Sequence, residues 1–268
     1  ASNGKFEKIP LPVNSSQSNL FVNSLLEDTG RQCIWIGTEG YLFQYFPSTG
    51  QMKQTEAFHN NSIKSLALDG NGYLLAGTDN GLYVYHNDVT PLQHIIHDSR
   101  NIQSLTNNII WNIFADQEHN IWLGTDYGIS LSRYNSALQF IPISQITGTG
   151  DGNQFYSLFR DSKGFYWFGG TNGLIRFTDP AGDKHNAIWY RMGDKTYPLS
   201  HNRIRHIYED KEQQLWIATD GSINRYDYAT RQFVHYNIVD STGTYNTNWT
   251  YYMFEDNAGH LWISTCLG

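Results

Sequence analysis

The stretch NIIWNIFADQEHNIWLGTDYGISLSRY, residues 108–134, is rich in β-branched and aromatic residues and contains two groups of turn-forming residues. Its apolar runs cover residues 109–115, 121–124 and 129–134, and the first turn begins at Asp116. Short apolar runs separated by Asp, Asn and Gly are typical of antiparallel strands joined by tight turns. The stretch therefore predicts three consecutive strands.

The same pattern recurs along the whole chain. Six positions equivalent to Trp122 follow one another at intervals of 40 to 49 residues; five of them hold Trp and the second holds Leu. An Asp stands six residues before this position in five units, and seven residues before it in the first unit. A shorter polar run, such as residues 139–143, completes each full unit, and four strands in about 45 residues are the signature of a propeller blade. The six positions are Trp35, Leu75, Trp122, Trp167, Trp216 and Trp262.

We therefore predict an all-β chain that forms a single β-propeller domain, or a fragment of one, over residues 1–268. Its blades are four-stranded and antiparallel, with five full blades and a partial sixth. Residues 5–10 are similar to the fourth strand of a unit and are expected to form an outer latch strand. Because the array stops inside its sixth unit, we expect the chain to be a piece of a longer protein and the ring to be an open arc. The expected blades cover residues 21–55, 62–96, 108–143, 153–192 and 202–236, with a partial blade at 248–268.

Composition excludes several classes of protein. The 268 residues include 25 acidic and 18 basic side chains, giving a net charge of −7, and no basic block is present. Nucleic-acid binding, which needs a concentrated Lys/Arg surface, is therefore not expected. No apolar run approaches the ~20 residues needed to cross a bilayer, and the N-terminus lacks the pattern of a signal peptide.

Catalytic and metal chemistry find little support in the sequence. The acidic residues mostly occupy the same turn in every unit, which favours a structural role like that of the Asp-box of sialidase propellers. A sialidase needs three arginines, and only Arg203 and Arg205 lie close together. The ten His residues show no metal-ligand spacing, and neither do Cys33 and Cys266. We predict no catalytic residue, no metal site and no cofactor.

The repeat resembles a known family. The unit resembles the two-component regulator propeller repeat in its Asn, Asp, Gly, Trp, Gly-Thr and Gly positions. The best matches are residues 108–134 and 153–177. Three departures are Leu75 for Trp, Gly170 for Thr, and a shortened turn at residues 220–222. The resemblance covers about residues 20–268 and implies the periplasmic sensor region of a bacterial hybrid two-component histidine kinase.

The resemblance also implies a function and partners. Members of this family are inner-membrane proteins with two periplasmic propellers, a stalk, one membrane span and cytoplasmic kinase and regulator regions. It implies that this chain is a non-catalytic, periplasmic sensor of oligosaccharides, dimeric in its parent protein, which controls genes for glycan use. The alternatives left open are a propeller that binds protein and, with less support, a propeller glycosidase or lyase.

Candidate ligand-binding residues are those at one rim of the propeller that differ between units. The position five residues before each turn Asp holds Asn23, Lys64, Trp111, Tyr156, Arg205 and Tyr251 in the six units. Aromatic faces stack on sugar rings, and Arg and amides bind hydroxyl or carboxylate groups. Packing between blades and a water-filled channel remain the alternative roles for each residue. The candidates are Trp111, Tyr156, Arg203, Arg205, Trp249, Tyr251, Asp126, Tyr127 and Asn172.

Overall fold

The computed structural model describes residues 8–12, 20–54, 58, 61–86, 90–134, 140–142, 154–178, 187–196, 198–239 and 247–266. These residues form five four-stranded sheets and one two-stranded sheet, all antiparallel between neighbours in sequence. The first sheet contains β1 (Val22–Asp28), β2 (Cys33–Thr38), β3 (Leu42–Phe46) and β4 (Gln51–Gln54). The second contains β5 (Ile63–Leu68), β6 (Leu74–Thr78), β7 (Gly81–Tyr85) and β8 (Gln93–Ile95).

The remaining sheets repeat this order. The third contains β9 (Ile110–Ala115), β10 (Ile121–Thr125), β11 (Gly128–Ser132) and β12 (Ile141–Pro142). The fourth contains β13 (Phe155–Arg160), β14 (Tyr166–Gly170), β15 (Gly173–Phe177) and β16 (Ile188–Tyr190). The fifth contains β17 (Ile204–Glu209), β18 (Leu215–Thr219), β19 (Ile223–Asp227) and β20 (Gln232–Tyr236). The sixth contains β21 (Thr250–Glu255) and β22 (Leu261–Thr265).

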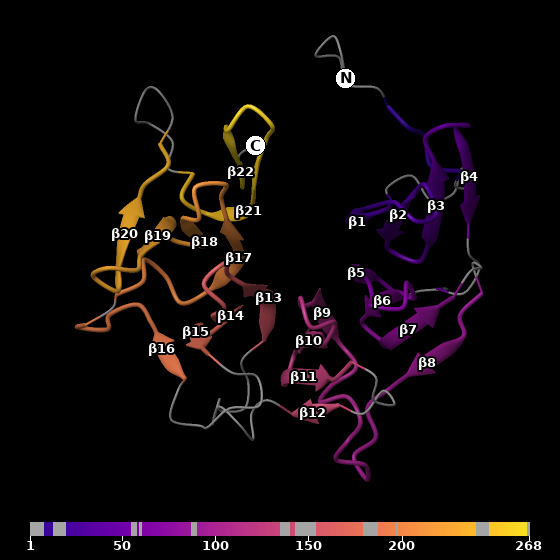
Figure 1. Ribbon diagram of the computed structural model, residues 1–268, viewed down its shortest axis with the longest axis horizontal. Coiled ribbons are helices and arrows are strands. Elements are labelled where there is room, and N and C mark those ends of the chain that lie inside the picture. The colour runs from indigo at the N-terminus through magenta and orange to yellow at the C-terminus, as the bar shows by residue number, and fades with distance from the viewer. Residues whose placement is uncertain are drawn as a thin grey trace.

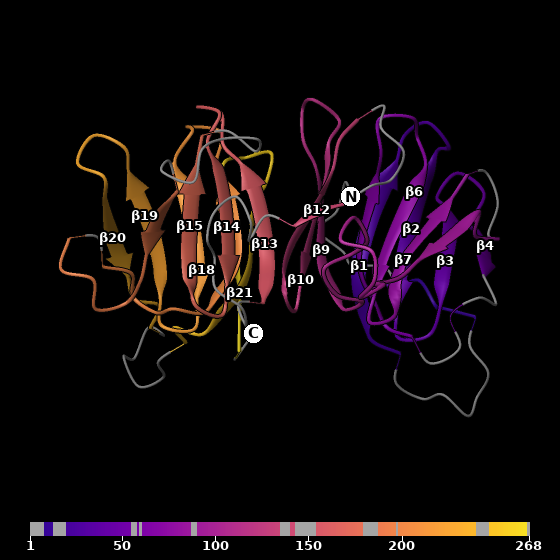
Figure 2. The ribbon, with the colours of Figure 1, turned by 90° about the horizontal axis from the view of Figure 1, so that it is seen from below.

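The six sheets follow one another around a common centre (Figure 1). The first strand of each sheet lies innermost and the fourth lies outermost, and the arc is open between β1 and the pair β21–β22. Figure 2, turned by 90°, shows the strands running between two opposite faces of the arc. The predicted propeller of five full blades and a partial sixth is thus confirmed.

The expected outer latch strand is not formed in the part that the structure describes. Residues 8–10 adopt no strand, and residues 5–7 lie outside the described residues. A fourth strand pairs with the third strand of its own blade, whereas the described part of the sixth sheet consists of β21 and β22. Residues 8–10 therefore have no third strand of the sixth sheet with which to pair in the described part of the chain.

The repeated Asp holds the turn between the first two strands of each blade. In the third blade, Asp116 Oδ1 accepts the backbone N–H groups of Glu118 (3.0 Å) and Asn120 (2.8 Å), while Oδ2 accepts the indole N–H of Trp122 (2.8 Å). The same Asp–indole bond occurs in every unit that has Trp, at 2.7 to 3.1 Å. This bonding accounts for the Asp residues without any catalytic role.

The Trp side chains fill the junctions between neighbouring blades. Trp122 and Trp167 are fully buried, with ring centroids 5.1 Å from Tyr166 and 4.9 Å from Tyr226 of the next blade. These indoles therefore separate adjacent blades. Trp262 is 56% exposed because no sheet follows β22 in the described chain.

Candidate functional site

Each innermost strand carries a β-bulge near its beginning. The pairing register of the first and second strands skips one residue in all six sheets, for example between Ile110 and Asn112. A bulge leaves its extra residue out of the ladder and redirects its side chain. The six skipped residues are Asn23, Lys64, Trp111, Tyr156, Arg205 and Tyr251.

Five of these bulge residues line one cavity of about 410 Å³, on the inner side of the arc. We call the six bulge residues the axial ring. Trp111 and Tyr156 meet edge to face with centroids 5.3 Å apart, and the Lys64 ammonium lies 4.4 Å from the centroid of Trp111. The Arg205 guanidinium lies 5.9 Å from the ring of Tyr156 and 5.3 Å from that of Tyr251. The cavity lining consists of Asn23, Trp111, Tyr156, Arg205 and Tyr251.

Two aspartates hold members of the axial ring in place. Asp126 accepts the indole N–H of Trp111 at 2.5 Å. Asp220, at the equivalent turn position two blades further on, accepts Arg205 Nε at 2.7 Å and Nη2 at 3.2 Å. This bidentate pair fixes the guanidinium plane and neutralises its charge. Among the residues that the structure describes, Arg205 Nη1 donates to no other group.

The hydroxyl of Tyr156 acts as a hydrogen-bond donor in this environment. It donates to Gln154 Oε1 at 2.5 Å. Burial raises the pKa of Tyr156, although the nearby guanidinium groups of Arg203 and Arg205 oppose that shift. The phenol therefore stays neutral at physiological pH.

The other sequence-predicted residues lie around the axial ring or away from it. Trp249 stacks on Tyr251 with centroids 6.2 Å apart and lies 5.9 Å from the Arg205 guanidinium. Arg203 reaches Asp220 at 3.8 Å. Tyr127, 61% exposed, and Asn172, also exposed, do not line the cavity.

The candidate set omitted three residues that the structure adds. Asn23 and Lys64 are axial-ring members and share the register position of Trp111, so the repeat alignment alone could have included them. Asp220 was read as part of a shortened turn. Its position directly after Thr219, like that of Asp126 after Thr125, was the signal that could have found it.

Other kinds of site are not found in the described part of the chain. No group of three or more His, Cys, Asp or Glu side chains there could hold a metal ion. None of the described segments is a helix long and apolar enough to cross a bilayer.

Comparisons with known proteins match the repeat and the fold. The two component regulator propeller family matches residues 104–127, 149–172 and 198–221. Histidine kinase P4 of Formosa agariphila is 25% identical over 263 residues, which are 88% of this chain and 18% of that protein.

Two kinds of solved structure are similar. One is described as the extracellular domain of a hybrid two component system of B. thetaiotaomicron: it is 94% identical over 100% of this chain and 36% of its own, with a TM-score of 0.48. Virginiamycin B lyase of Staphylococcus aureus shares the fold, with 13% identity over 96% of this chain and 80% of its own and a TM-score of 0.67.

A second extracellular domain of a hybrid two component system of B. thetaiotaomicron has a TM-score of 0.62 at 18% identity, over 91% of this chain and 43% of its own. This chain thus spans less than half of these extracellular domains and about a fifth of the curated kinase. The matched repeats and the blade structure that they form agree with one another. The chain is therefore a propeller segment in which residues 104–127, 149–172 and 198–221 match the two component regulator propeller repeat.

Proposed function

We propose that this chain is part of the extracytoplasmic sensor of a hybrid two-component histidine kinase and that it binds an oligosaccharide at the axial ring. The observation that carries the proposal is that the bulge residues of five of the six sheets line one cavity, and that three of these five are aromatic. Aromatic faces pack against the C–H faces of sugars, while an oriented guanidinium and amide bind hydroxyl groups.

The charges of the site favour a neutral sugar over an acidic one. Asp220 already neutralises Arg205, and Asp126 lies beside Trp111. A uronate carboxylate would have to compete with Asp220 for the same guanidinium, whereas a hydroxyl can accept from the remaining Nη1. We therefore assign neutral oligosaccharides as the ligand class.

Signalling requires that the ligand distinguish two arrangements of the parent protein. A ligand shifts an equilibrium only by its difference in affinity for the two states. In this proposal the sugar contacts bulge residues of several blades and thereby stabilises one arrangement of the sensor in a homodimer. That arrangement transmits the signal across the membrane to a kinase, which regulates genes for glycan use. The further propeller, stalk and kinase regions belong to the rest of the parent chain.

Calorimetric titration of the purified chain tests the binding step. We expect heat with neutral oligosaccharides, and roughly tenfold or greater loss of affinity in Trp111→Ala and Tyr156→Ala. Loss of one stacked aromatic ring costs about 1–3 kcal/mol when the ligand ring is a nucleobase, and we expect a comparable loss for a sugar. Tyr127→Ala is the matched control, because that exposed ring lies off the cavity. Binding unchanged in all three variants would place the site elsewhere. Absence of heat with every neutral and acidic glycan would favour the protein-binding alternative.

A further inference from the structure

Junctions between blades are normally filled by two aromatic rings. The Trp of one blade packs against an aromatic residue at the end of the third strand of the next blade. Trp122 lies 6.1 Å from Phe177, and Trp167 lies 4.9 Å from Tyr226, between ring centroids. Trp35 shares a buried cluster with Tyr85, the corresponding residue of the second blade.

The junction between the second and third blades lacks both rings. Leu75 stands where the other blades have Trp, and it packs against the third blade in the same way. Ser132 pairs with Ile121 as Phe177 pairs with Tyr166, so it occupies the position of the missing second ring. Two independent departures from the repeat therefore face each other across one junction.

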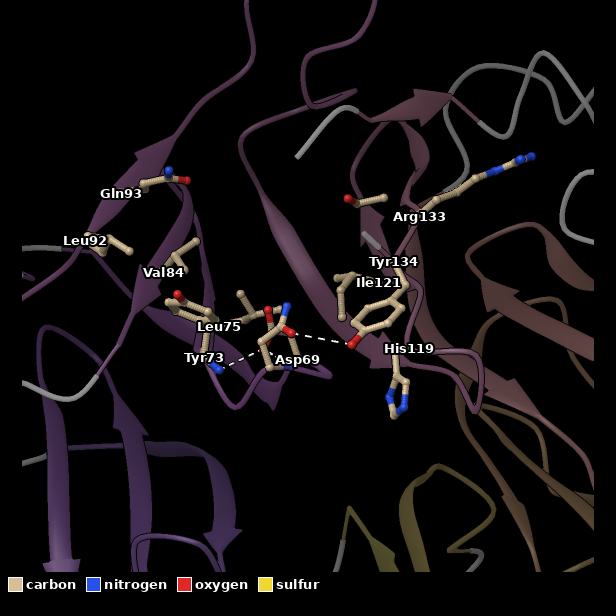
Figure 3. A pocket seen from close by; sticks show the side chains of 12 residues that line it. Asp69, Tyr73, Leu75, Val84, Leu92, Gln93, His119, Ile121, Arg133 and Tyr134 are labelled. Carbon is tan, nitrogen blue, oxygen red and sulfur yellow. Dashed lines mark hydrogen bonds between the residues drawn. The ribbon is translucent and has the colours of Figure 1, made fainter. Parts of the chain in front are cut away.

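A pocket of about 230 Å³ lies at this junction, with Leu75 and Ser132 in its lining. Figure 3 shows Asp69, Leu75 and Val84 on one side, and Ile121 and Tyr134 on the other. The Tyr134 hydroxyl donates across the junction to Asn71 Oδ1 at 3.5 Å. The pocket thus has apolar side walls, and the Tyr134 ring enters it beside Asn71, but no ring occupies the positions of Leu75 and Ser132.

Asp69 completes the pocket with a hydrogen-bond acceptor. Its Oδ1 accepts the backbone N–H groups of Asn71 (2.9 Å) and Tyr73 (2.8 Å), as the equivalent Asp does in the third to sixth blades. Its Oδ2 corresponds to the oxygen that accepts an indole N–H in the five other blades. Within the described residues, Asp69 Oδ2 accepts no hydrogen bond.

We propose that this pocket binds a small planar aromatic molecule that carries an N–H or O–H donor, such as an indole or a phenol. The ring takes the place between Leu75 and Ser132, and its donor bonds to Asp69 Oδ2. The apolar contacts come from Val84 and Ile121. Bound ligand then joins the second and third blades as the chain's own rings join the others. This site is separate from the axial ring and does not depend on the sugar proposal.

Ligand-observed NMR titration with free indole tests the site. We expect saturable binding of indole, and about tenfold weaker binding of 1-methylindole, which cannot donate to Asp69. Asp69→Asn places an amide N–H₂ toward the pocket and should reduce indole affinity to that of 1-methylindole. Equal binding of the two probes to the unmodified chain would contradict the assigned role of Asp69.

Filling the pocket from within the chain gives the second test. Leu75→Trp supplies the missing indole, so indole affinity should fall at least tenfold while the melting temperature rises. Ser132→Phe fills the pocket from the third blade, and it replaces Leu75→Trp in this test if Leu75→Trp does not fold. Ile102→Trp, at a position that is 78% exposed and outside the pocket, is the matched control and should bind indole as the unmodified chain does. The proposal is overturned if indole does not bind the unmodified chain, or if it binds a folded, pocket-filled variant unchanged.

Discussion

The side chain of Asp116 satisfies more donors than any turn role requires. Besides two backbone N–H groups, its Oδ2 accepts the Trp122 indole (2.8 Å), the Asn120 amide (3.0 Å) and the Tyr166 hydroxyl (3.2 Å). The carboxylate is buried, and Tyr166 belongs to the next blade. One residue therefore links a turn, its own blade and the neighbouring blade.

Asp116→Ala should lower the free energy of unfolding by about 3 kcal/mol, because it leaves buried donors without an acceptor. Asp69→Ala is the matched control: that residue holds the same turn but receives no indole N–H, so about 1 kcal/mol is expected. Urea unfolding followed by tryptophan fluorescence measures both values. Equal losses in the two variants would show that the turn bonds, and not the indole and tyrosine bonds, determine the effect.

His206 occupies a position where three of the six blades have serine. The hydroxyls of Ser24, Ser65 and Ser157 each accept a backbone N–H from the next blade at 3.0 to 3.1 Å. In the fifth blade, Nδ1 of His206 accepts the N–H of Met253 at 3.2 Å. Only a neutral imidazole can accept this bond, and burial lowers the pKa of His206 to about 4.

The stability of the chain should therefore fall as pH drops from about 6.5 toward 4. In that window the unfolded chain binds a proton on His206 that the folded chain does not, and the linked contribution is about 3 kcal/mol at most. His206→Ser keeps the acceptor of the other blades without a titrating group. Melting temperatures between pH 4 and 7 should thus be less pH-dependent in His206→Ser. Parallel curves for the two proteins would contradict the assignment.

Sequence reasoning at the residue scale succeeded where the repeat fixed a register. It brought together Trp111, Tyr156, Arg205 and Tyr251 because they share one offset from the turn Asp, and these four line the axial cavity. It selected Tyr127 from the same rim, yet that exposed side chain does not line the cavity. The direction of a side chain depends on the bulge geometry, and the type of residue at a position does not reveal that geometry.

The second strand of each blade requires a small residue where the next blade approaches. A Cβ added at Gly124 would lie 2.5 Å from the carbonyl oxygen of Phe155 in the next blade, and one added at Gly77 would lie 2.7 Å from Ile110. The equivalent residue of the fifth blade is Ala218, which faces the sixth sheet. The last junction thus accommodates a Cβ at this position.

Gly124→Ala should separate the third and fourth blades slightly and cost roughly 1–3 kcal/mol, as overpacking does in a well-packed core. Ala218→Gly, the reverse change at the equivalent position, should cost about 1 kcal/mol or less through backbone entropy. Chemical denaturation of both variants is the measurement. A neutral Gly124→Ala would mean that the junction can relax without loss.

The first three strands of each blade were predictable as elements because they are short, mostly apolar and bounded by turn residues. The fully buried second strands β6, β10 and β14 confirm that an apolar run without alternation indicates a strand covered on both faces. The latch expected at residues 5–10 stays a prediction, because residues 5–7 lie outside the described residues. Its pairing depends on a third strand supplied by another part of the array, and local sequence similarity carries no information about that partner.

The two ends of the arc expose large apolar side chains. Phe21 and Leu25 lie exposed at the first sheet, and Phe254 and Trp262 at the sixth. Apolar patches of this kind favour association. In the four inner junctions the corresponding faces are covered by neighbouring blades.

The isolated chain should therefore bind a hydrophobic dye and self-associate as its concentration rises. Replacing both Phe254 and Trp262 with Gln should reduce dye fluorescence and shift light-scattering mass toward the monomer. Replacing the exposed Tyr127 with Gln is the control and should change neither. A monomer at all concentrations with no dye binding would show that these end faces are already covered.

At the scale of the whole molecule, the repeat predicted the architecture, and the ligand is the part that remains a proposal. A crystal structure of the chain with a bound neutral oligosaccharide tests it most directly. We predict a sugar ring packed against Trp111 and Tyr156, with a hydroxyl accepting from Arg205 Nη1. A sugar bound on the outer strands, with the axial ring unoccupied, would contradict the account.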